Sequence, residues 1–423
     1  MPASSPHSPL RVGLLGAGTV GGAVARAFRD EPERLAPFDG ARIVLARVAV
    51  RDTARAAVAG IPEDLLTDAP ANLVASPEVD IVVELIGGDE PARTLIAASL
   101  AAGKPVVTAN KHVLAHHGPE LEVLARSTGT PLRFEAAVAA GIPVLGPLGA
   151  DLAANRIDRV RGIVNGTTNF ILSAMGERGR AYDLVLLEAQ RAGYAEADPA
   201  GDVEGGDALN KLVVLARLAF GTWLDPASIE RRPATALGLG RPGITGVRAE
   251  EVAAAGVHGL RLKLIADARR TSDESDEIEA RVQVVAVPGD SGFGRTSGVL
   301  NRIEIDATPL GRLVLTGPGA GGGPTGSAVL GDLIALARGA GSTWAGLAPA
   351  SERCVAAADP DLALPRPWFF QSVLPEQLVR DQVDIAAAAG DGFVTTEQSL
   401  DELRAGLAAI GIDATLYPIE DDE

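Results

Sequence analysis

A glycine-rich turn near the N-terminus constrains the fold of this chain more than any other feature. The apolar run 11–15 (RVGLL) leads directly into residues 16–21 (GAGTVG), and a helical run, AVARAFR, follows. This is the G-x-G-x-x-G pattern in its context of strand, tight turn and helix, where glycines let a pyrophosphate approach the helix N-terminus. Alone the pattern is weak, but in this context it predicts a dinucleotide-binding α/β domain.

The end of the second expected strand bears on cofactor preference. Residues 42–50 form a mostly apolar run that stops at Val50-Arg51-Asp52. An acidic residue here commonly binds the ribose hydroxyl of NAD, whereas an arginine meets the 2′-phosphate of NADP. Arg51 therefore favours NADP as the cofactor, whereas Asp52 beside it is compatible with NAD. An arginine that is simply solvated would explain Arg51 equally well.

Two further buried-type strands, residues 80–88 (DIVVELIGG) and 104–111 (KPVVTANK), end in glycine or polar residues. Ligands of open α/β sheets gather outside the carboxyl ends of the strands, which places Asn110 and Lys111 beside the nicotinamide end of a cofactor. Position alone does not exclude an ordinary solvated lysine. In the next strand, residues 132–138, Glu135 is either an edge-facing charge or a paired functional carboxylate.

A polar turn follows the next expected strand. Residues 160–172, VRGIVNGTTNFIL, predict a strand, this turn and the start of a helix. Thr167 or Thr168 would cap the helix, and the exposed main-chain amides would suit a carboxylate ligand. Capping without a ligand is the simpler explanation of the threonines.

The stretch 188–220 carries the strongest candidate for a substrate site. A helix beginning near Gly206 puts Asp207 and Lys211 four residues apart on one face, within contact distance. An acidic loop followed by a solvated surface pair is the alternative. The residues after Lys211, LVVLARLAF, are apolar almost all round, which predicts a buried helix and favours a functional lysine. The carboxylates gathered in this stretch are Glu196, Asp198, Asp202, Glu204 and Asp207.

The second half of the chain changes character. Runs at 256–270, 277–287 and 300–307 alternate like amphipathic antiparallel strands, which predicts an α+β second domain. A glycine-rich loop and an apolar helix follow at 317–338 and predict a second close approach of backbone to a ligand. A flexible linker is the alternative, which the attached helix disfavours. The section after residue 339 suggests a linker and then strands around one helix.

Composition narrows the class of protein. A length of 423 residues predicts two to three domains. The net charge of −17, from 38 basic and 55 acidic residues, argues against nucleic acid and anionic membranes as partners. A single cysteine, Cys354, excludes an internal disulfide framework and fits a reducing compartment. Because the sequence shows neither a secretory signal nor an 18-residue apolar run, we expect a cytoplasmic enzyme or binding protein.

Taken together, these motifs resemble the homoserine dehydrogenase family over roughly residues 11–338. The carrying segments are GLLGAGTVG, ELIGG, TANKHVLA, EAAVAAGIP, GIVNGTTNFIL, GYAEADPAGDVEGGDALNKLVVLARLAFG and GPGAGG with SAVLGDL. The family interconverts aspartate 4-semialdehyde and homoserine with NAD(P)H, on the route to threonine and methionine. The resemblance implies a Rossmann-type dinucleotide-binding domain (1–135, completed by 316–340), an inserted α+β catalytic and dimerisation domain (136–315) and a small C-terminal extension (341–423).

The resemblance also implies roles for individual residues. Lys211 and Lys111 match the active-site lysines, and Asp207 orients the substrate. We expect a homodimer through the second domain's sheet. The implied substrate-binding residues are Glu196, Asp202, Asp207, Gly166 and Thr167. The implied cofactor-binding residues are Gly16, Gly18, Thr19, Val20, Gly21, Arg51, Lys111, Gly319 and Gly321. A sodium ion would be bound by Glu135, Val138, Ala140 and Ile142, mostly through main-chain carbonyls.

Two departures and two alternatives accompany the resemblance. The last 85 or so residues lack a clear βαββαβ pattern, which puts a ligand-sensing ACT domain and feedback control by threonine in doubt. The cation segment reads AVAAG where a second glycine is common. An aspartate semialdehyde dehydrogenase would use a cysteine nucleophile, but Cys354 lies away from every motif. A non-catalytic dinucleotide sensor predicts loss of Lys111, Asp207 and Lys211, which are all present.

Overall fold

The structure of the chain, a computed structural model, describes residues 9–35, 42–272, 275–357 and 364–420. It divides into two compact units. The first contains residues 1–156, 213–224 and 318–354, and the second contains residues 157–212, 225–317 and 355–423. In the described part of the chain, no helix is long and apolar enough to cross a membrane.

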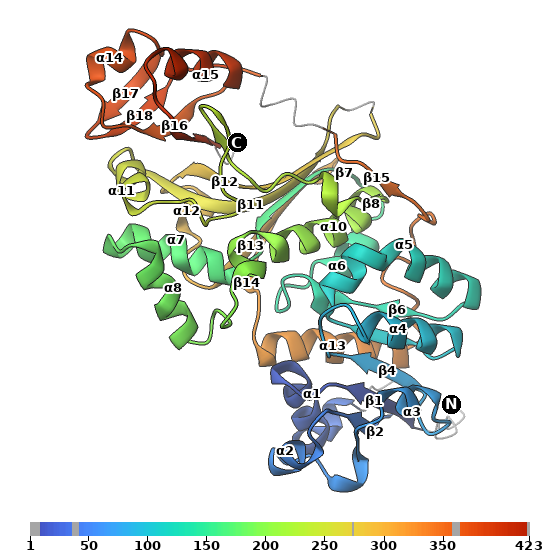
Figure 1. Cartoon of the computed structure of the whole chain (residues 1–423). Helices are drawn as coiled ribbons and strands as arrows, with labels where there is room; N and C mark the ends of the chain where they lie inside the picture. Colours follow the sequence, from blue (N-terminus) through green and yellow to red (C-terminus); the bar gives the residue numbers. More distant parts are fainter. Residues whose placement is uncertain (1–8, 36–41, 273–274, 358–363, 421–423) are drawn as a thin grey trace. The chain divides into compact units, whose positions relative to one another are not determined.

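The first unit is built on a six-stranded parallel sheet in the order β3-β2-β1-β4-β5-β6 (Figure 1). This is the strand order of a Rossmann dinucleotide-binding fold, as the glycine-rich turn predicts. The strands are β1 (Leu10–Leu15), β2 (Ile43–Ala49), β3 (Leu66–Thr67), β4 (Ile81–Glu84), β5 (Val106–Thr108) and β6 (Leu132–Arg133). The helices include α1 (Thr19–Asp30), α2 (Thr53–Val58), α3 (Pro70–Ala75), α4 (Ala92–Ala101), α5 (Lys111–Thr128), α6 (Leu145–Gly149) and α13 (Gly322–Ala337).

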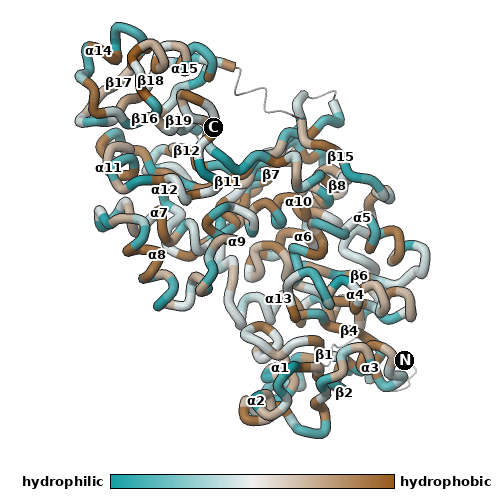
Figure 2. Tube along the Cα trace, in the orientation of Figure 1, coloured by the Kyte–Doolittle hydropathy of each residue, from teal (hydrophilic) through white to brown (hydrophobic). Residues whose placement is uncertain are grey.

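The core of this unit joins segments that are far apart in sequence. Every residue of β4 is buried, as expected for a parallel strand with helices on both faces of its sheet. Val329 and Leu333 of α13 pack into the same apolar cluster as Val12 and Leu14 of β1. Figure 2 shows the apolar character of β1 and β4 along the chain. Helix α13 therefore completes the dinucleotide-binding unit from about 300 residues downstream.

The second unit contains a five-stranded sheet in the order β12-β11-β7-β13-β14. Strands β11 and β12 pair antiparallel along their whole length, in agreement with the predicted α+β domain. The strands are β7 (Arg156–Ile163), β11 (Leu260–Arg270), β12 (Ile278–Pro288), β13 (Leu300–Thr308) and β14 (Gly311–Pro318). The helices are α7 (Gly166–Arg178), α8 (Tyr182–Arg191), α9 (Ala200–Val203), α10 (Gly206–Phe220), α11 (Ala249–Val257) and α12 (Gly292–Arg295).

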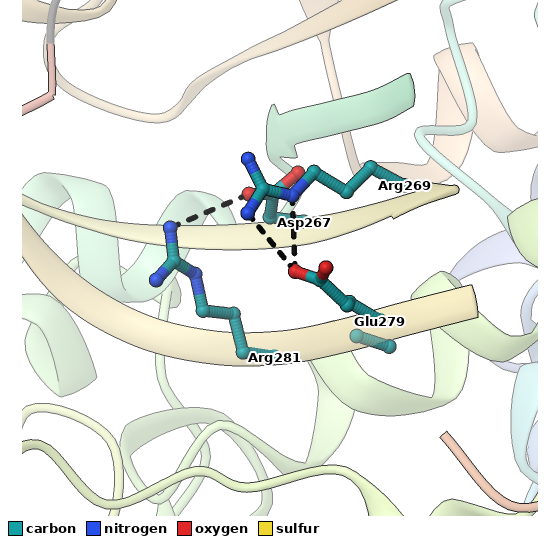
Figure 3. Close-up of a pocket in the computed structure, with 5 residues that line it drawn as sticks. Asp267, Arg269, Glu279 and Arg281 are labelled. Atoms are coloured by element: carbon teal, nitrogen blue, oxygen red, sulfur yellow. Dashed lines mark hydrogen bonds and ion pairs between the residues drawn. The ribbon is translucent and has the colours of Figure 1, made fainter. Parts of the chain in front are cut away.

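A network of ion pairs lies on β11 and β12 (Figure 3). Asp267 lies 3.6 Å from Arg281, and Arg269 lies 3.0 Å from Glu279. Burial alone would raise the pKa of Asp267, but Arg159 and the neighbouring arginines hold it well below its usual range. The cavity that these side chains line measures only about 10 Å³, room for about one water molecule. This cavity therefore offers no space for a substrate.

The C-terminal section has a more regular fold than the sequence predicts. Its elements follow the order β16 (Trp368–Gln371), α14 (Glu376–Arg380), β17 (Ile385–Ala389), β18 (Gly392–Thr395), α15 (Leu400–Ala409) and β19 (Thr415–Pro418). This is a βαββαβ arrangement with the antiparallel order β19-β16-β18-β17, typical of ferredoxin-like modules. The expectation that this section lacks the pattern is therefore wrong. Two short strands, β9 (Ala234–Thr235) and β10 (Gly238–Leu239), extend the sheet beside β19.

Candidate active site

The glycine-rich turn between β1 and α1 has the backbone geometry that its sequence predicts. Gly16 has a φ of +93°, and a Cβ added there would lie 2.7 Å from the carbonyl oxygen of Leu85. A Cβ on Gly21 would overlap the carbonyl oxygen of Gly16. Gly18 precedes α1 as its N-cap and has open space around the position of a Cβ. A diphosphate can therefore approach the start of α1, where main-chain N–H groups point outward.

A cavity of about 420 Å³ opens beside this turn. Its volume lies within the usual range of small-ligand sites. Its lining includes Gly18, Thr19 and Gly22 from the turn and α1, and Arg42 and Leu45 from the region of β2. The dinucleotide-binding unit therefore holds a preformed hollow next to the predicted diphosphate site.

The second glycine-rich loop returns to the same turn. Gly321 has a φ of +112° and is the N-cap of α13. A Cβ added to Gly322 would lie 2.8 Å from the carbonyl oxygen of Thr19. Gly319 is buried in the same loop. Both glycine-rich segments singled out from the sequence thus meet at the start of α1, within one unit.

Arg51 and Asp52, which follow β2, have different surroundings. Asp52 is the N-cap of α2 and accepts a hydrogen bond of 2.9 Å from the main-chain N–H of Arg55. Arg51 is exposed and is not among the residues that line the cavity. Helix capping accounts for Asp52, so its carboxylate by itself does not indicate NAD.

Lys111 is the first residue of α5, at the carboxyl end of β5. Its neighbour Asn110 caps the helix and donates a hydrogen bond of 2.8 Å to the carbonyl oxygen of Gly88. Glu84, which no sequence motif singles out, is a fully buried carboxylate at the end of β4. Glu84 accepts hydrogen bonds from Thr108 (2.6 Å) and from the main-chain N–H groups of residues 86 and 87. Its position in an apolar strand was the one available signal.

In the second unit, Lys211 and Asp207 form the predicted contact. Helix α10 begins at Gly206, and the Lys211 ammonium lies 2.7 Å from a carboxylate oxygen of Asp207. The same ammonium donates to the carbonyl oxygen of Val164, also at 2.7 Å. Lys211 is only 8% exposed, so the alternative of a solvated surface pair is wrong. Figure 2 shows the apolar character of α10 that accompanies this burial.

Asn165, which no sequence motif singles out, connects the carboxylates of this cluster. Its amide nitrogen donates to Asp202 and to Asp207, at 2.8 Å each. Its amide oxygen caps α7 by accepting from the main-chain N–H of Thr168 at 2.8 Å. Because Asn165 lies 37 to 42 residues from these carboxylates in sequence, no local pattern indicated the contact.

Asp202 is a half-buried carboxylate in the same cluster. Burial raises its pKa, and the nearby Asp207 carboxylate raises it further. The Thr167 hydroxyl lies 3.2 Å from Asp202 and donates to the carbonyl oxygen of Tyr194 at 2.7 Å. The side chain of Thr167 therefore belongs to the cluster. The prediction that Thr167 or Thr168 caps the helix is wrong, because Asn165 is the cap.

Glu196 lies apart from these groups. It is exposed in the turn before α9, and its carbonyl oxygen accepts a hydrogen bond from Gln190. Within the described ranges, no hydrogen bond or ion pair joins its carboxylate to Asp202, Asp207 or Lys211.

The predicted cation segment forms a tight loop around Glu135. This carboxylate accepts main-chain hydrogen bonds from Val144, Leu145 and Gly146, at 2.6 to 2.9 Å. Burial raises the pKa of Glu135 despite these bonds. Ala139 and Ala140 have positive φ values of 49° and 26°. In the part of the chain that the structure describes, no main-chain hydrogen bond ends on the buried carbonyl oxygens of Val138, Ala140 or Ile142.

The sequence and the fold match known proteins over most of the chain. Two family models match, "Homoserine dehydrogenase" over residues 143–334 and "Homoserine dehydrogenase, NAD binding domain" over residues 16–135. The homoserine dehydrogenase of Mycobacterium tuberculosis is 44% identical over 334 residues, which cover 78% of this chain and 73% of that protein.

Solved structures give the same relationship. A homoserine dehydrogenase from Thiobacillus denitrificans superimposes with a TM-score of 0.84 at 35% identity, covering 98% of this chain and 99% of that one. A hyperthermophilic archaeal homoserine dehydrogenase in complex with NADPH superimposes with a TM-score of 0.62 at 27% identity, covering 77% and 97%. The Rossmann turn, the Asp207–Lys211 cluster and these matches agree, and the chain belongs to the homoserine dehydrogenase family, NAD(P)-dependent oxidoreductases that act on a CH–OH group.

Proposed function

We propose that Lys211 is the proton donor when this enzyme reduces aspartate 4-semialdehyde to homoserine, with help from Lys111. The observation that carries the proposal is the buried Lys211–Asp207 contact of 2.7 Å. An ammonium has three N–H donors. Two of those of Lys211 are directed at Asp207 and Val164, which leaves one for the substrate's oxygen.

The chemistry of the reduction calls for such a group. The nicotinamide supplies a hydride to the aldehyde carbon, and the carbonyl electron pair moves onto oxygen. Lys211 gives its proton to that oxygen, which becomes the hydroxyl of homoserine, and the neutral amine regains a proton from solvent. A donor held within hydrogen-bond reach by a neighbouring carboxylate stabilises the developing charge. In the oxidation direction the same amine accepts the hydroxyl proton.

The substrate's other groups would bind around the same cluster. Asp207 would orient the substrate, and Asp202 and Glu196 would contribute to binding its ammonium group. The main chain at Gly166 and Thr167 would bind the carboxylate, because these residues begin α7 and helix N-termini favour anions. An exposed Glu196 would have to move towards the cluster when substrate binds.

The cofactor assignment rests on the first unit. Gly16, Gly18, Thr19, Val20 and Gly21 would bind the diphosphate, and Gly319 and Gly321 would close over it. Lys111 would lie at the nicotinamide end. Arg51 would meet a 2′-phosphate if NADP is preferred, and titration of both cofactors in one assay decides between NADP and NAD.

A monovalent cation, with sodium as the candidate, fits the loop around Glu135. Among the described residues, the main-chain carbonyls of the buried residues Val138, Ala140 and Ile142 accept no main-chain hydrogen bond, and such oxygens are ligands of the kind that hard cations take. Glu135 would supply the negative charge. Sodium chloride should then raise the unfolding midpoint more than choline chloride at equal ionic strength.

The wider role of the protein follows from the family resemblance. We propose that residues 1–135 with 316–340 bind the dinucleotide, and that residues 136–315 provide the substrate site and a homodimer contact. The enzyme would act in the cytoplasm, in threonine and methionine biosynthesis.

Substitution of Lys211 tests the proposal. Lys211→Ala should bind NAD(P)H almost as wild type does, while turnover with aspartate 4-semialdehyde falls by orders of magnitude. Cofactor affinity is measured by fluorescence titration and turnover by oxidation of NAD(P)H. Near-normal turnover in this variant would rule out Lys211 as the proton donor.

A further inference from the structure

Asn301, in β13, is a buried polar side chain that the predicted site does not include. It is 0% exposed, and neither its amide nitrogen nor its amide oxygen has a hydrogen-bond partner among the described residues. Most buried side-chain amides are hydrogen-bonded, because leaving them unpaired destabilises the folded state. The two unpaired amide atoms of Asn301 should therefore have a hydrogen-bond partner outside the described residues, such as a bound ligand.

The position of Asn301 follows from how β13 lies against β7. The two strands are neighbours in the five-stranded sheet. A Cβ added to Gly162 would lie 3.3 Å from the Cα of Ile303, and one added to Gly166 would lie 3.5 Å from the Cα of Val299. Residue numbers rise along one segment as they fall along the other, so the two segments run antiparallel.

This register puts Asn301 beside Val164, midway between those two contacts. Val164 is the first residue beyond the end of β7, and the register set by the contacts of Gly162 and Gly166 places it opposite Asn301. The carbonyl oxygen of Val164 is the group that accepts the hydrogen bond of 2.7 Å from Lys211. The unpaired amide therefore neighbours the strand end to which the proposed proton donor is tied.

The surrounding polar groups are paired, which sets Asn301 apart. The carbonyl oxygen of Leu300, directly before it, accepts a hydrogen bond of 3.1 Å from Asn169. Asn169 is itself 2% exposed and also accepts from Lys263 at 2.9 Å. Two buried asparagines thus lie in one neighbourhood, one with both amide atoms paired and one with neither.

We propose that Asn301 is a substrate-binding residue, whose amide hydrogen-bonds to the amino-acid substrate when it binds beside Lys211. A primary amide both donates and accepts, so it can donate to the carboxylate of a zwitterion and accept from its ammonium group. The inference rests on the proposed function, because it takes Lys211 as the centre of the substrate site. Lys211, Asn165 and Thr167 are themselves at most 8% exposed. The burial of Asn301 is therefore of the same kind as that of the groups proposed to act on the substrate.

The test uses the full-length enzyme and compares Asn301→Leu with the matched variant Asn169→Leu. Leucine has nearly the size of asparagine and removes the unpaired polar atoms. Without substrate, Asn301→Leu should unfold at the same temperature as wild type or higher, whereas Asn169→Leu should unfold at a lower one. With homoserine, Asn301→Leu should show a KM at least tenfold higher and lose most of the homoserine-dependent rise in unfolding temperature. Affinity for NAD(P)H should stay within twofold.

Each outcome bears on the proposal. An unchanged KM for homoserine in Asn301→Leu would overturn the inference. If the variant were also less stable than wild type, Asn301 would be a structural residue. Asn301→Ala gives the same kinetic test if the leucine variant does not fold. Absence of homoserine oxidation by the wild-type enzyme would instead refute the proposed function, and the unfolding temperatures would still report whether the amide is unpaired.

Discussion

Glu122 of α5 and Arg217 of α10 form a two-pronged ion pair that is closed to solvent. The guanidinium donates to both carboxylate oxygens, at 2.7 and 2.8 Å, and the Arg217 and Glu122 side chains are 0% and 1% exposed. Trp223 donates to the same carboxylate at 2.8 Å. Breaking a buried pair leaves an uncompensated charge in the core, which is far more costly than losing a surface pair.

Removal of the Glu122 charge should therefore destabilise the protein strongly. Glu122→Gln keeps the size of the side chain, and we expect the free energy of unfolding to fall by about 3–5 kcal/mol. The control is Glu120→Gln, two residues away, which breaks an ion pair with Arg93 whose side chains are 50% and 36% exposed. That change should cost about 1 kcal/mol or less. Equal losses in urea unfolding would contradict the prediction.

The Glu122 carboxylate should also make the free energy of unfolding fall in acid solution. Burial alone would raise the pKa of Glu122, but Arg217, Trp223 and Arg126 together hold it below its usual value. A depressed folded-state pKa gives stability that is fully present above the unfolded pKa and is lost as pH falls through the folded one. Unfolding measured from pH 7 down to pH 3 should show a smaller loss in Glu122→Gln than in wild type. Parallel curves would argue against this ion pair as a source of acid sensitivity.

Gly322 offers a test of the contact between the two glycine-rich segments. A Cβ there would lie 2.8 Å from the carbonyl oxygen of Thr19, so Gly322→Ala must push α13 from the start of α1. Gly323 is next in the same helix, and a Cβ added to it would have no other atom within 4 Å. We expect Gly322→Ala to raise the KM for NAD(P)H about tenfold, equivalent to about 1.4 kcal/mol. Gly323→Ala should leave it unchanged, and similar effects in both would refute a local clash.

Lys263 should make stability rise with pH in mildly alkaline solution. Burial lowers its pKa from 10.5 to about 8, against a smaller raising effect of Glu177, while Arg261 lowers it further. Between about pH 8 and 10.5 the unfolded chain binds the extra proton, so the free energy of unfolding increases with pH over that window. The full effect would be on the order of 3 kcal/mol. The difference in unfolding free energy between wild type and Lys263→Met, measured from pH 7 to 10, should show this rise, and a constant difference would contradict it.

Local patterns in the sequence predicted the parts of the molecule whose partners are close in sequence. The glycine turn at 16–21 fixes strand, turn and helix together, and the four-residue spacing of Asp207 and Lys211 needs only a helix to bring them into contact. The contacts of Asn165 could not be predicted, because its partners Asp202 and Asp207 lie on two other helices, α9 and α10. An asparagine in a turn usually hydrogen-bonds to its own backbone. The role of Glu84 could not be predicted for the same reason, because Thr108, whose hydroxyl donates to it, lies on the neighbouring strand.

The C-terminal module was missed for a different physical reason. Helix α14 has five residues, and strands β16, β18 and β19 have four each. Segments this short hold barely one period of a helix and two of a strand, so their apolar patterns are ambiguous. Their structure comes from tertiary packing, in which Trp368, Phe370 and Phe393 share one core with Leu403 of α15. Helix α15 carries a clear local signal, its capping box formed by Ser399 and Glu402.

Ala139, in the loop around Glu135, has a backbone conformation whose cost can be tested by substitution. Its φ of 49° lies in the left-handed region, which costs a residue with a Cβ about 1–2 kcal/mol. Glycine removes that cost but adds freedom to the unfolded chain, an offset of about 0.4–1 kcal/mol. Ala139→Gly should therefore stabilise the protein by about 0.5–1 kcal/mol in urea unfolding. Ala137 lies in the preceding turn and does not have a positive φ. Ala137→Gly should therefore destabilise the protein by a similar amount. If both changes destabilise, the loop around Glu135 holds Ala139 without strain, and the alanine costs nothing there.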